Sequence, residues 1–248
     1  MAAGLGTRLR GYMQETPKPL IRVLDIPLII YPVANLLRKG VRKLYIVVNR
    51  GNYELIKALF TQTEIDVDFV INSYPERGNG YSLYLGMSRV RGENFYLVMS
   101  DHIHHPSIFD LMHAHVGCGE VLVCVDSKPA YIDVGEATKV LIKDFMLCDI
   151  GKALQNYTHV DTGLFIIQSS LYKYINKYCK ENLTVEVSGL IKYLISVNRK
   201  VLGIDVSGAG WLEIDTIEDL KRAESEAKGL IQEILNTLSS TIKLVYKP

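Results

Sequence analysis

The sequence predicts an α/β protein in which a mixed, mostly parallel sheet of Rossmann-like type has helices on both faces. Helical and extended patterns alternate over the first hundred residues, a glycine-rich loop opens the chain, and a later apolar strand ends in an aspartate. Alternation of this kind produces parallel strands, because each intervening helix returns the chain to the same edge of the sheet. Ligands of such sheets bind where the carboxyl ends of the strands collect.

The composition indicates a globular chain with a sizeable core, since 48% of the 248 residues are hydrophobic and 22% are charged. The net charge of +1 gives no general basic field, which argues against nucleic acid as a partner. The chain has no run of about 18 apolar residues, so no membrane span is predicted. The cysteines have no C-x-x-C spacing and no signal peptide precedes them, which favours reduced thiols in the cytoplasm over disulfides.

The chain begins with the stretch AAGLGTRLR, followed by TPKPL. Gly4 and Gly6 allow the backbone to approach a ligand closely, and a helix predicted to begin near Thr7 would direct its free N–H groups at that ligand. Arg8 adds a permanent cation, and Lys18 adds a second between two prolines that keep the chain extended. Two cations and a set of amides suit a triphosphate. The alternative is a tight glycine turn with solvated basic residues.

Two better-known phosphate loops do not match this stretch. The dinucleotide fingerprint requires a glycine where the chain has Leu9, and a P-loop requires Lys-Ser or Lys-Thr where Tyr12 follows Gly11. A phosphate loop of this kind should also follow a buried strand, yet only two residues precede Ala3. Either that strand lies upstream of Met1 or the protein lacks it, and we favour the first alternative.

The elements that follow the loop alternate regularly. Helical apolar spacing over residues 28–39 stops at Gly40, and residues 43–49 form a short β-rich run. Residues 53–62 are then predicted as a helix and 67–72 as a strand.

The loop PERGNGYSL, residues 75–83, is the next candidate for ligand binding. Gly78 and Gly80, on either side of Asn79, bring backbone amides and carbonyls close to a flat ligand, and residues 81–87 are predicted to be helical. A purely structural turn is the alternative.

The apolar strand FYLVMSD, residues 95–101, delivers Asp101 at its carboxyl end. Mg²⁺ favours one or two carboxylates together with substrate phosphates, so Asp101 is a candidate magnesium ligand. An aspartate that only caps a helix is the alternative.

Histidines follow this aspartate at once. They are His102, His104 and His105, with His113 and His115 on the next predicted helix. A zinc site is conceivable, but the run has no matching second half, so surface or loop histidines are favoured. His102 can still line a pocket.

The second half of the chain has shorter strands. Residues 121–126, 137–143 and 160–167 are predicted as strands of a mixed or antiparallel part of the sheet that forms the acceptor side.

The C-terminal part combines a strand, a capped helix and a helical tail. The strand WLEI precedes Asp215, and Thr216 is predicted to cap a helix from Ile217. We expect one domain over residues 1–228 and a mildly amphipathic helical tail over 229–248, which would be a natural terminus or the junction to a further domain.

These motifs resemble the sugar-1-phosphate nucleotidyltransferase family. Both AAGLGTRLR and TPKPLI match its signature at about the family's spacing, and the ending around WLEIDT is similar, with Ile217 in place of the usual proline. The resemblance implies the nucleotide-diphospho-sugar transferase fold, in which a hydrophobic first strand lies just before the loop.

The resemblance also implies roles for particular residues. The nucleotide would contact Ala3, Gly4, Leu5, Gly6, Thr7, Arg8, Lys18, Gly78, Asn79, Gly80 and Ser100. The acceptor would contact Lys152, Asp161, Thr162, Gly163 and Glu186. The catalytic residues would be Arg8, Lys18, Asp101 and Asp215. We expect Asp101 and Asp215 to bind Mg²⁺ jointly, because each ends a strand of one sheet.

Within this family, RGNGYSL, SDH, ATKV and VDTG are most similar to the archaeal and thermophile CTP:inositol-1-phosphate cytidylyltransferases. The similarity implies Mg²⁺-dependent transfer from CTP to inositol-1-phosphate, giving CDP-inositol and pyrophosphate without a general base. Alternatives are a hexose-1-phosphate enzyme using UTP, dTTP or GTP, a phosphocholine cytidylyltransferase, and a nucleotide-binding regulatory subunit without catalysis. Such relatives are often fused to a membrane-embedded alcohol phosphatidyltransferase, so we expect a fusion or an association of that kind.

Overall fold

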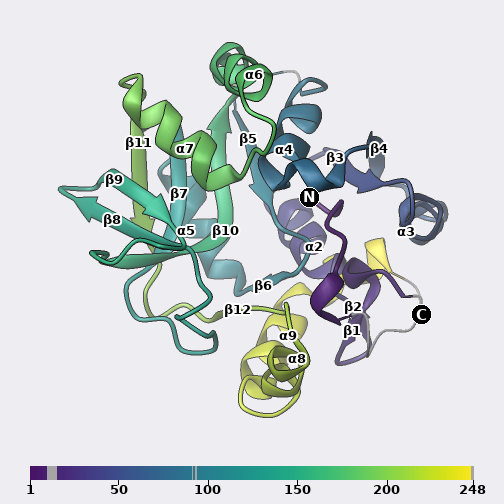
Figure 1. Cartoon of the computed structure of the whole chain (residues 1–248). Coiled ribbons are helices and arrows are strands. Elements are labelled where there is room, and N and C mark those ends of the chain that lie inside the picture. The colour runs from purple at the N-terminus through teal and green to yellow at the C-terminus, as the bar shows by residue number, and fades with distance from the viewer. Residues whose placement is uncertain (10–15, 91, 93, 247–248) are drawn as a thin grey trace.

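The structure, a computed structural model of the chain, describes residues 1–9, 16–90, 92 and 94–246, without the side chain of Thr7. Its centre is a six-stranded sheet of these described residues, with the order β5–β10–β7–β11–β9–β8 (Figure 1). The strands are β5 (Asn94–Val98), β7 (Val121–Asp126), β8 (Lys139–Lys143), β9 (Met146–Gly151), β10 (His159–Gln168) and β11 (Val201–Asp205).

Three two-stranded sheets accompany the central one among the described residues. They are β1 (Arg22–Val23) with β2 (Ile26–Pro27), β3 (Lys43–Asn49) with β4 (Asp66–Asn72), and β6 (His102–His104) with β12 (Trp211–Glu213). The predicted mixed α/β class is confirmed. β3 is parallel to β4 and β7 to β11, whereas β10 is antiparallel to β5, β7 and β8. The antiparallel pairs of β8 with β9 and of β10 with β7 and β8 lie over residues 121–168, where the sequence predicts a mixed or antiparallel part of the sheet.

The first residues of the chain lie between the β3–β4 pair and the central sheet. The Ala2 N–H donates to the carbonyl of Val47 in β3 at 2.8 Å, and the Ser100 N–H donates to the carbonyl of Met1 at 3.1 Å. The glycine loop therefore starts where two sheets meet. The strand expected before this loop stays a prediction.

Helices cover the central sheet on both faces (Figure 1). One core contains residues of α2 (Ile30–Arg38), α3 (Tyr53–Phe60), α5 (Pro106–Ala114), α8 (Ile217–Glu224) and α9 (Lys228–Val245). The other core contains residues of α4 (Asn79–Met87), α6 (Tyr172–Glu181) and α7 (Val187–Ser196). β7 separates the two, because Leu122 and Cys124 belong to the first core while Val121, Val123 and Val125 belong to the second.

Short 3-10 helices occur in the connections: η1 (Thr7–Leu9), η2 (Lys18–Leu20), η3 (Pro75–Arg77) and η4 (Ser169–Leu171). α9 is the helix predicted for the C-terminal tail, and it buries Ile231, Ile234 and Leu238 in the same core as α2. Residues 247 and 248 of that tail lie outside the described residues. Within the described ranges, none of the helices has the length and apolar character needed to cross a membrane.

Candidate active site

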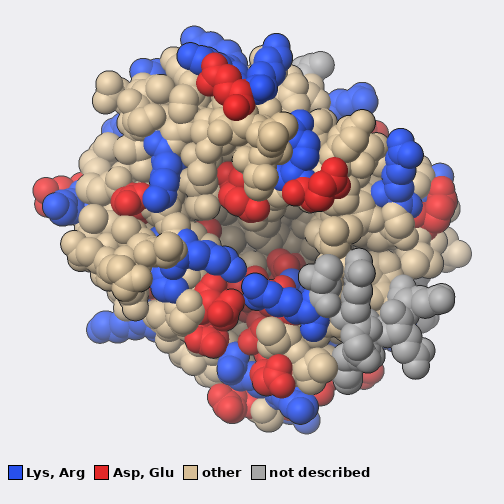
Figure 2. Space-filling model, viewed as in Figure 1, with Lys and Arg blue, Asp and Glu red and all other residues tan. Residues whose placement is uncertain are grey.

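A cavity of about 400 Å³ opens beside the segments that follow β5 and β12. Charged side chains of both signs surround the hollow on this face of the molecule (Figure 2). Its lining includes residues from all the predicted motifs, namely Ala3, Gly4, Gly6, Arg8, Lys18, Gly78, Asn79, Ser100, Asp101, Lys152, Asp161, Gly163 and Asp215. The structure therefore brings residues that are far apart in the sequence to one site.

Lys18 lies between two carboxylates. Its Nζ is 2.5 Å from Oδ2 of Asp101 and 2.7 Å from Oδ1 of Asp215, and only 10% of its side chain is exposed. Burial disfavours the charged ammonium, but the charges of Asp101 and Asp215 and their hydrogen bonds outweigh burial and raise the pKa of Lys18. This lysine therefore keeps its positive charge at the junction of the two acidic residues.

The same ion pair shifts the pKa of Asp101 in the opposite direction. Burial would raise the pKa of its carboxyl, but the charge of Lys18 and the hydrogen bond from His102 hold this pKa far below its usual value. The carboxylate is therefore ionised at every physiological pH and can bind a cation.

Arg8 lies on the outer side of Asp215. Its Nη1 donates to Oδ2 of Asp215 at 2.6 Å and lies 3.5 Å from a carboxylate oxygen of Glu136. About half of the Arg8 side chain is exposed, so its guanidinium borders the open part of the cavity. Asp215 thus has a cation on each of its two oxygens.

A backbone hydrogen bond explains why the two aspartates meet. The Ile214 N–H, one residue before Asp215, donates to the carbonyl of Asp101 at 3.0 Å. We expected both aspartates to end strands of one sheet, and that explanation is wrong, since β12 pairs with β6 and not with a strand of the central sheet. The predicted cap of α8 is confirmed, because the Thr216 hydroxyl accepts from the Asp219 N–H.

The glycine loop lines the cavity with Ala3, Gly4 and Gly6. Gly6 has a φ of +59°, and a Cβ there would lie 3.2 Å from Cβ of Lys18, so the turn and the close approach both favour glycine. The helix expected from Thr7 is a 3-10 helix that extends to Leu9 within the described part of the chain. Residues 10–15 lie outside it.

Two more residues assigned to the nucleotide lie near this loop. Leu5 is half-exposed and is not part of the cavity lining, whereas Ser100 is buried and lines the cavity. Their roles stay predictions.

The loop at residues 78–80 contacts the segment that precedes α7. A Cβ on Gly78 would lie 2.5 Å from the carbonyl oxygen of Val185, and one on Gly80 would lie 2.7 Å from the carbonyl carbon of Glu186. Oδ1 of Asn79 accepts from the Val187 N–H at 2.8 Å. These glycines therefore serve the packing of α4 against this segment. Gly78 also lines the cavity, whereas Gly80 does not, and its predicted contact with the nucleotide stays a prediction.

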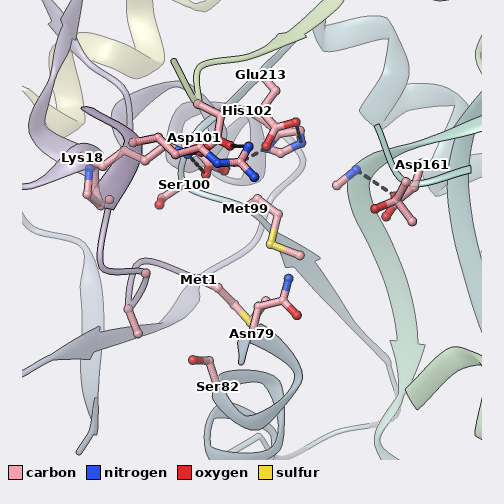
Figure 3. Close-up of a pocket in the computed structure, with 18 of the residues that line it drawn as sticks. Met1, Lys18, Asn79, Ser82, Met99, Ser100, Asp101, His102, Asp161 and Glu213 are labelled. Carbon is pink, nitrogen blue, oxygen red and sulfur yellow. Dashed lines mark hydrogen bonds and ion pairs between the residues drawn. The ribbon is translucent and has the colours of Figure 1, made fainter. Parts of the chain in front are cut away.

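Asn79, the first residue of α4, and Glu186, which directly precedes α7, each form a hydrogen bond from the side chain to the backbone of the other's helix. The backbone N–H of Asn79 donates to the Glu186 carboxylate, while burial raises the pKa of that carboxyl. Figure 3 shows Asn79 with its amide nitrogen directed into the cavity. Glu186 is not part of the cavity lining, and its predicted contact with the acceptor stays a prediction.

Asp161, Gly163 and Lys152 form the side of the cavity predicted for the acceptor. Burial raises the pKa of Asp161 to about 7, although the Gly163 N–H, at 2.9 Å from Oδ1, lowers it in part. Thr162 points away, because its buried hydroxyl donates to the carbonyl of Cys124 in the core.

The prediction that the histidines after Asp101 are surface or loop residues is wrong for His102 and His104. Both lie in β6 and are buried, His104 almost completely. Nδ1 of His102 is 2.8 Å from Oδ1 of Asp101, and its ring is stacked on Trp211 with centroids 6.0 Å apart. Burial lowers the pKa of His104 to about 3, so this ring is neutral. His102 therefore positions a carboxylate of the site.

Glu213 is a site residue that the sequence did not reveal. It lines the cavity, and its carboxylate is 3.9 Å from Nε2 of His102. Glu213 pairs with His102 across β12 and β6. Its place in the site depends on the pairing of β12 with β6, which no local pattern in the sequence shows.

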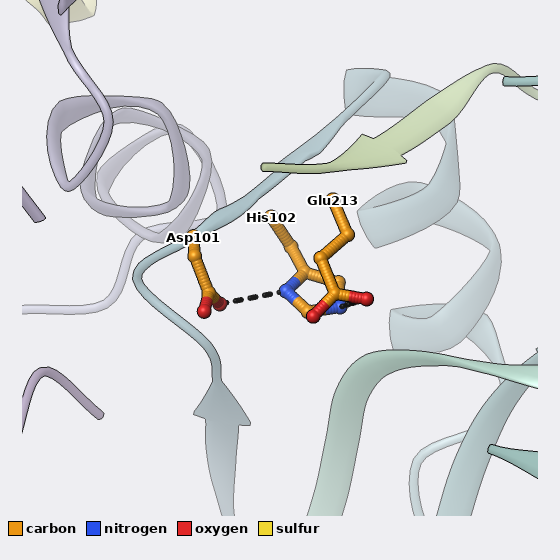
Figure 4. Close-up of side chains that lie close together, drawn as sticks. All are labelled: Asp101, His102 and Glu213. Atoms are coloured by element: carbon orange, nitrogen blue, oxygen red, sulfur yellow. Dashed lines mark hydrogen bonds and ion pairs between the residues drawn. The ribbon is translucent and has the colours of Figure 1, made fainter. Parts of the chain in front are cut away.

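Among the residues that the structure describes, two groups of side chains in the cavity could hold a metal ion. Asp101, His102 and Glu213 have ligand atoms within 4.8 Å of one another (Figure 4). Nδ1 of His102 already binds Asp101, however, and hard divalent cations prefer oxygen ligands. Asp101 and Asp215 fit such a cation better, because they present carboxylate oxygens to a single position that the Lys18 ammonium now fills. The site therefore suits a divalent metal.

Comparison with known proteins gives consistent matches. Residues 1–162 match the family described as MobA-like NTP transferase domain. The chain is 34% identical to the bifunctional IPC transferase and DIPP synthase of Aquifex aeolicus, over 90% of this chain and 50% of that protein. It is also 34% identical to the protein of the same name from Thermococcus kodakarensis, over 90% of this chain and 48% of that protein. The chain thus spans about half the length of these relatives.

A solved structure agrees with these matches. The inositol-1-phosphate CTP transferase from T. maritima superposes with a TM-score of 0.86 and 26% identity, over 94% of each chain. The predicted nucleotide-diphospho-sugar transferase fold is confirmed.

Proposed function

Because the chain belongs to the MobA-like NTP transferase domain family, we propose that its main cavity transfers a cytidylyl group from CTP to inositol-1-phosphate. The products would be CDP-inositol and pyrophosphate. The observation that supports this most is the position of Lys18, whose buried ammonium contacts Asp101 and Asp215 beside the glycine loop. A cation and two carboxylates that meet beside a glycine loop are typical of a site that transfers phosphoryl groups.

The reaction is an in-line displacement at the α-phosphorus. An oxygen of the acceptor phosphate forms a bond to the α-phosphorus of CTP, and the bond from that phosphorus to the bridging oxygen of the pyrophosphate breaks. The acceptor phosphate is already ionised at neutral pH, because its second pKa is near 6. No general base is therefore required.

The residues of the chain bind and orient the reactants. Lys18 donates hydrogen bonds to the reacting phosphates, and Arg8, at the open side of the cavity, holds the departing pyrophosphate. Asp101 and Asp215 would hold Mg²⁺, which when bound supplies positive charge that stabilises the phosphate oxygens during transfer. His102 keeps Asp101 in position through the hydrogen bond at Nδ1.

The acceptor side fits a phosphorylated polyol. Asp161 and Glu213 offer carboxyl groups that can bind hydroxyls, and Lys152 offers a cation for the acceptor phosphate. The structural relative from T. maritima is an inositol-1-phosphate CTP transferase, which supports inositol-1-phosphate as the acceptor. The relatives from Aquifex aeolicus and Thermococcus kodakarensis are named as bifunctional proteins, and this chain covers about half of their length. We therefore propose that this unit works together with a second enzyme, by fusion or by association.

Pyrophosphate release with different substrate pairs tests this function. CTP, UTP, dTTP and GTP would each be combined with inositol-1-phosphate, glucose-1-phosphate, mannose-1-phosphate and phosphocholine in the presence of Mg²⁺. We expect the highest kcat/KM for CTP with inositol-1-phosphate. A higher value for a hexose-1-phosphate or for phosphocholine would overturn the substrate assignment and leave the reaction class in place.

Variants test whether the cavity performs the reaction. Asp101→Asn should lower kcat by about 100-fold or more, since it removes one of the two carboxylates that would hold Mg²⁺ at the reacting phosphates. Asp68→Asn is the matched control, because Asp68 pairs with Lys43 on the exposed part of β4. Equal rates for the parent and Asp101→Asn would refute catalysis at this site.

A further inference from the structure

We propose that Ser82, oriented by Asn72, determines the preference for cytosine by donating a hydrogen bond to the base, an inference that presupposes nucleotide binding in the cavity as proposed above. Asn72 ends β4 and is fully buried, and Ser82, in α4, is 4% exposed. Nδ2 of Asn72 donates to Oγ of Ser82 at 3.0 Å. The pair is a buried polar contact at the wall of the cavity.

The orientation of the Asn72 amide is fixed by the backbone. The Tyr74 N–H donates to Oδ1 of Asn72 at 2.8 Å, so the oxygen of the amide must face Tyr74 and the nitrogen must face Ser82. The Ser82 hydroxyl therefore accepts from Asn72. Within the described part of the chain, its own proton has no acceptor.

The Asn72–Ser82 contact satisfies the buried amide of Asn72 and leaves the proton of the Ser82 hydroxyl over. Oδ1 of Asn72 closes the turn to Tyr74, and that bond does not depend on a serine in α4. Burying a hydroxyl without satisfying its proton costs free energy. A ligand atom that accepts this proton would remove the cost.

The position of Ser82 matches that of a base. Ser82 lines the same cavity as Lys18 and Asp101. In Figure 3, Lys18 and Asp101 lie at one end of the cavity, and Ser82 lies beside Asn79 and Met1 at the other. A nucleotide whose phosphates contact Lys18 would extend its base toward the end that holds Ser82.

A donor at this position distinguishes cytosine from uracil. Atom N3 of cytosine is a hydrogen-bond acceptor, whereas N3 of uracil has a hydrogen and is a donor. Opposite uracil, the second lone pair of Ser82 Oγ would accept from N3–H, and the buried hydroxyl proton would be left without an acceptor, which costs about 1 to 3 kcal/mol. A hydroxyl that already accepts from Asn72 therefore favours CTP.

Equilibrium binding of CTP and UTP, measured by calorimetry with Mg²⁺ and no acceptor, tests the inference. Ser82→Ala should weaken CTP binding by about 3- to 10-fold, the value of one neutral hydrogen bond, and change UTP binding by less than about 2-fold. Ser196→Ala is the control, because its hydroxyl donates to the Tyr193 carbonyl on the exposed surface of α7. An unchanged ratio of CTP to UTP affinity in Ser82→Ala would overturn the inference.

A second variant reverses the polarity of the contact. Asn72→Asp keeps an oxygen for the Tyr74 N–H but offers Ser82 an acceptor in place of a donor, so the hydroxyl proton would turn toward residue 72. Ser82 would then present lone pairs to the base. We expect the ratio of CTP to UTP affinity to fall by about 10-fold or to invert. A purely structural role would weaken both nucleotides equally, and that result would contradict the inference.

The two proposals fail in different ways. If the ratio of CTP to UTP affinity changes as expected in both variants but the parent does not turn over inositol-1-phosphate, the proposed function is refuted and the role of Ser82 is kept. Turnover of CTP with inositol-1-phosphate, with an unchanged ratio in both variants, would refute the role of Ser82 and keep the function.

Discussion

At the scale of single residues, the proposed function gives Lys18 two roles that exclude each other in time. Its ammonium neutralises Asp101 and Asp215, at 2.5 and 2.7 Å. The same two carboxylates are the proposed ligands of a divalent cation. Under this proposal, cation binding would require that Lys18 move away, and the phosphates of the nucleotide would provide the partner to which it moves.

We predict that Lys18→Met binds Mn²⁺ about 10-fold or more tightly than the parent without nucleotide, because a competing charge is removed from the two carboxylates. Turnover should fall by about 100-fold or more, since Lys18 also contacts the reacting phosphates. Titration followed by electron paramagnetic resonance measures the free Mn²⁺. Lys43→Met, at the partly exposed start of β3 and outside the lining of the cavity, should change neither quantity. Weaker Mn²⁺ binding in Lys18→Met would show that the ammonium does not compete.

Asp161 makes stability depend on pH. Burial raises the pKa of its carboxyl from 3.8 to about 7 in the folded protein. Between these values, the unfolded chain has lost this proton while the folded protein keeps it, so the free energy of unfolding falls as the pH rises.

Asp161→Asn cannot ionise and should therefore become more stable relative to the parent as the pH rises from about 4 to about 8. We expect the free energy of unfolding of Asp161→Asn to rise by about 2 kcal/mol relative to that of the parent over this pH range. This is less than the full pKa shift of Asp161 implies, because the cavity admits water. Urea unfolding at several pH values measures this difference. Asp149→Asn, whose parent residue pairs with Lys192 near the surface, should show no such trend. Parallel pH profiles for Asp161→Asn and the parent would contradict the prediction.

At the scale of elements, the contact between α4 and the segment before α7 depends on the absence of a side chain at residue 80. A Cβ on Gly80 would lie 2.7 Å from the carbonyl carbon of Glu186 and 2.8 Å from the carbonyl oxygen of Val185. Both are backbone atoms, which cannot rotate away. The packing of α4 against this segment therefore requires glycine at residue 80.

Gly80→Ala should lower the free energy of unfolding by about 1 to 3 kcal/mol and weaken nucleotide binding, because α4 must move away from Val185 and Glu186. Gly229→Ala is the matched control, since a Cβ there meets no atom within 4 Å and the residue lies in the first turn of α9. This control should be neutral or stabilising by about 0.5 to 1 kcal/mol. Urea unfolding compares both variants, and equal stability of the two would refute the clash.

Local patterns predicted the elements that have strong local signals. β3 and β7 have the predicted bounds at both ends, and α8 begins at the predicted cap, Thr216. β6 was missed because its three residues are held by pairing with β12, more than a hundred residues away. α6 was missed because its sequence is polar overall, although its two buried residues, Ile175 and Cys179, lie four apart on one face of the helix.

The residues of the candidate site also divide into those with a local signal in the sequence and those that depend on distant contacts. Arg8, Lys18, Asp101 and Asp215 could be selected because each lies in a motif with its own chemistry, and the structure places them together. Glu213 and the buried state of His102 depend on the register of β6 against β12, which no local pattern shows. The contact between Asn72 and Ser82 likewise depends on how α4 packs on β4.

At the scale of the whole molecule, α9 joins the end of the chain to its beginning. Its buried residues lie in the same core as those of α2, and α2 and α9 are in contact. The predicted division between residues 1–228 and 229–248 stays a prediction, and the stability of the molecule can test it.

Leu238→Ala should lower the free energy of unfolding by about 2 to 5 kcal/mol in a single transition, because Leu238 is fully buried and its removal leaves a cavity. Leu244→Ala, on the same helix, should stay within about 0.5 kcal/mol of the parent, because Leu244 is 69% exposed. Circular dichroism during urea unfolding measures both. A separate early transition for α9 would support a tail that folds independently of residues 1–228.

The stacking of Trp211 on His102 has a practical consequence. Trp211 is the one tryptophan of the sequence, its indole N–H donates to Asp126 at 2.8 Å, and it lines the cavity. The intrinsic fluorescence of the protein at tryptophan wavelengths therefore originates from a single indole at the wall of the site. Its emission should report directly, without any attached dye, when a ligand enters beside His102.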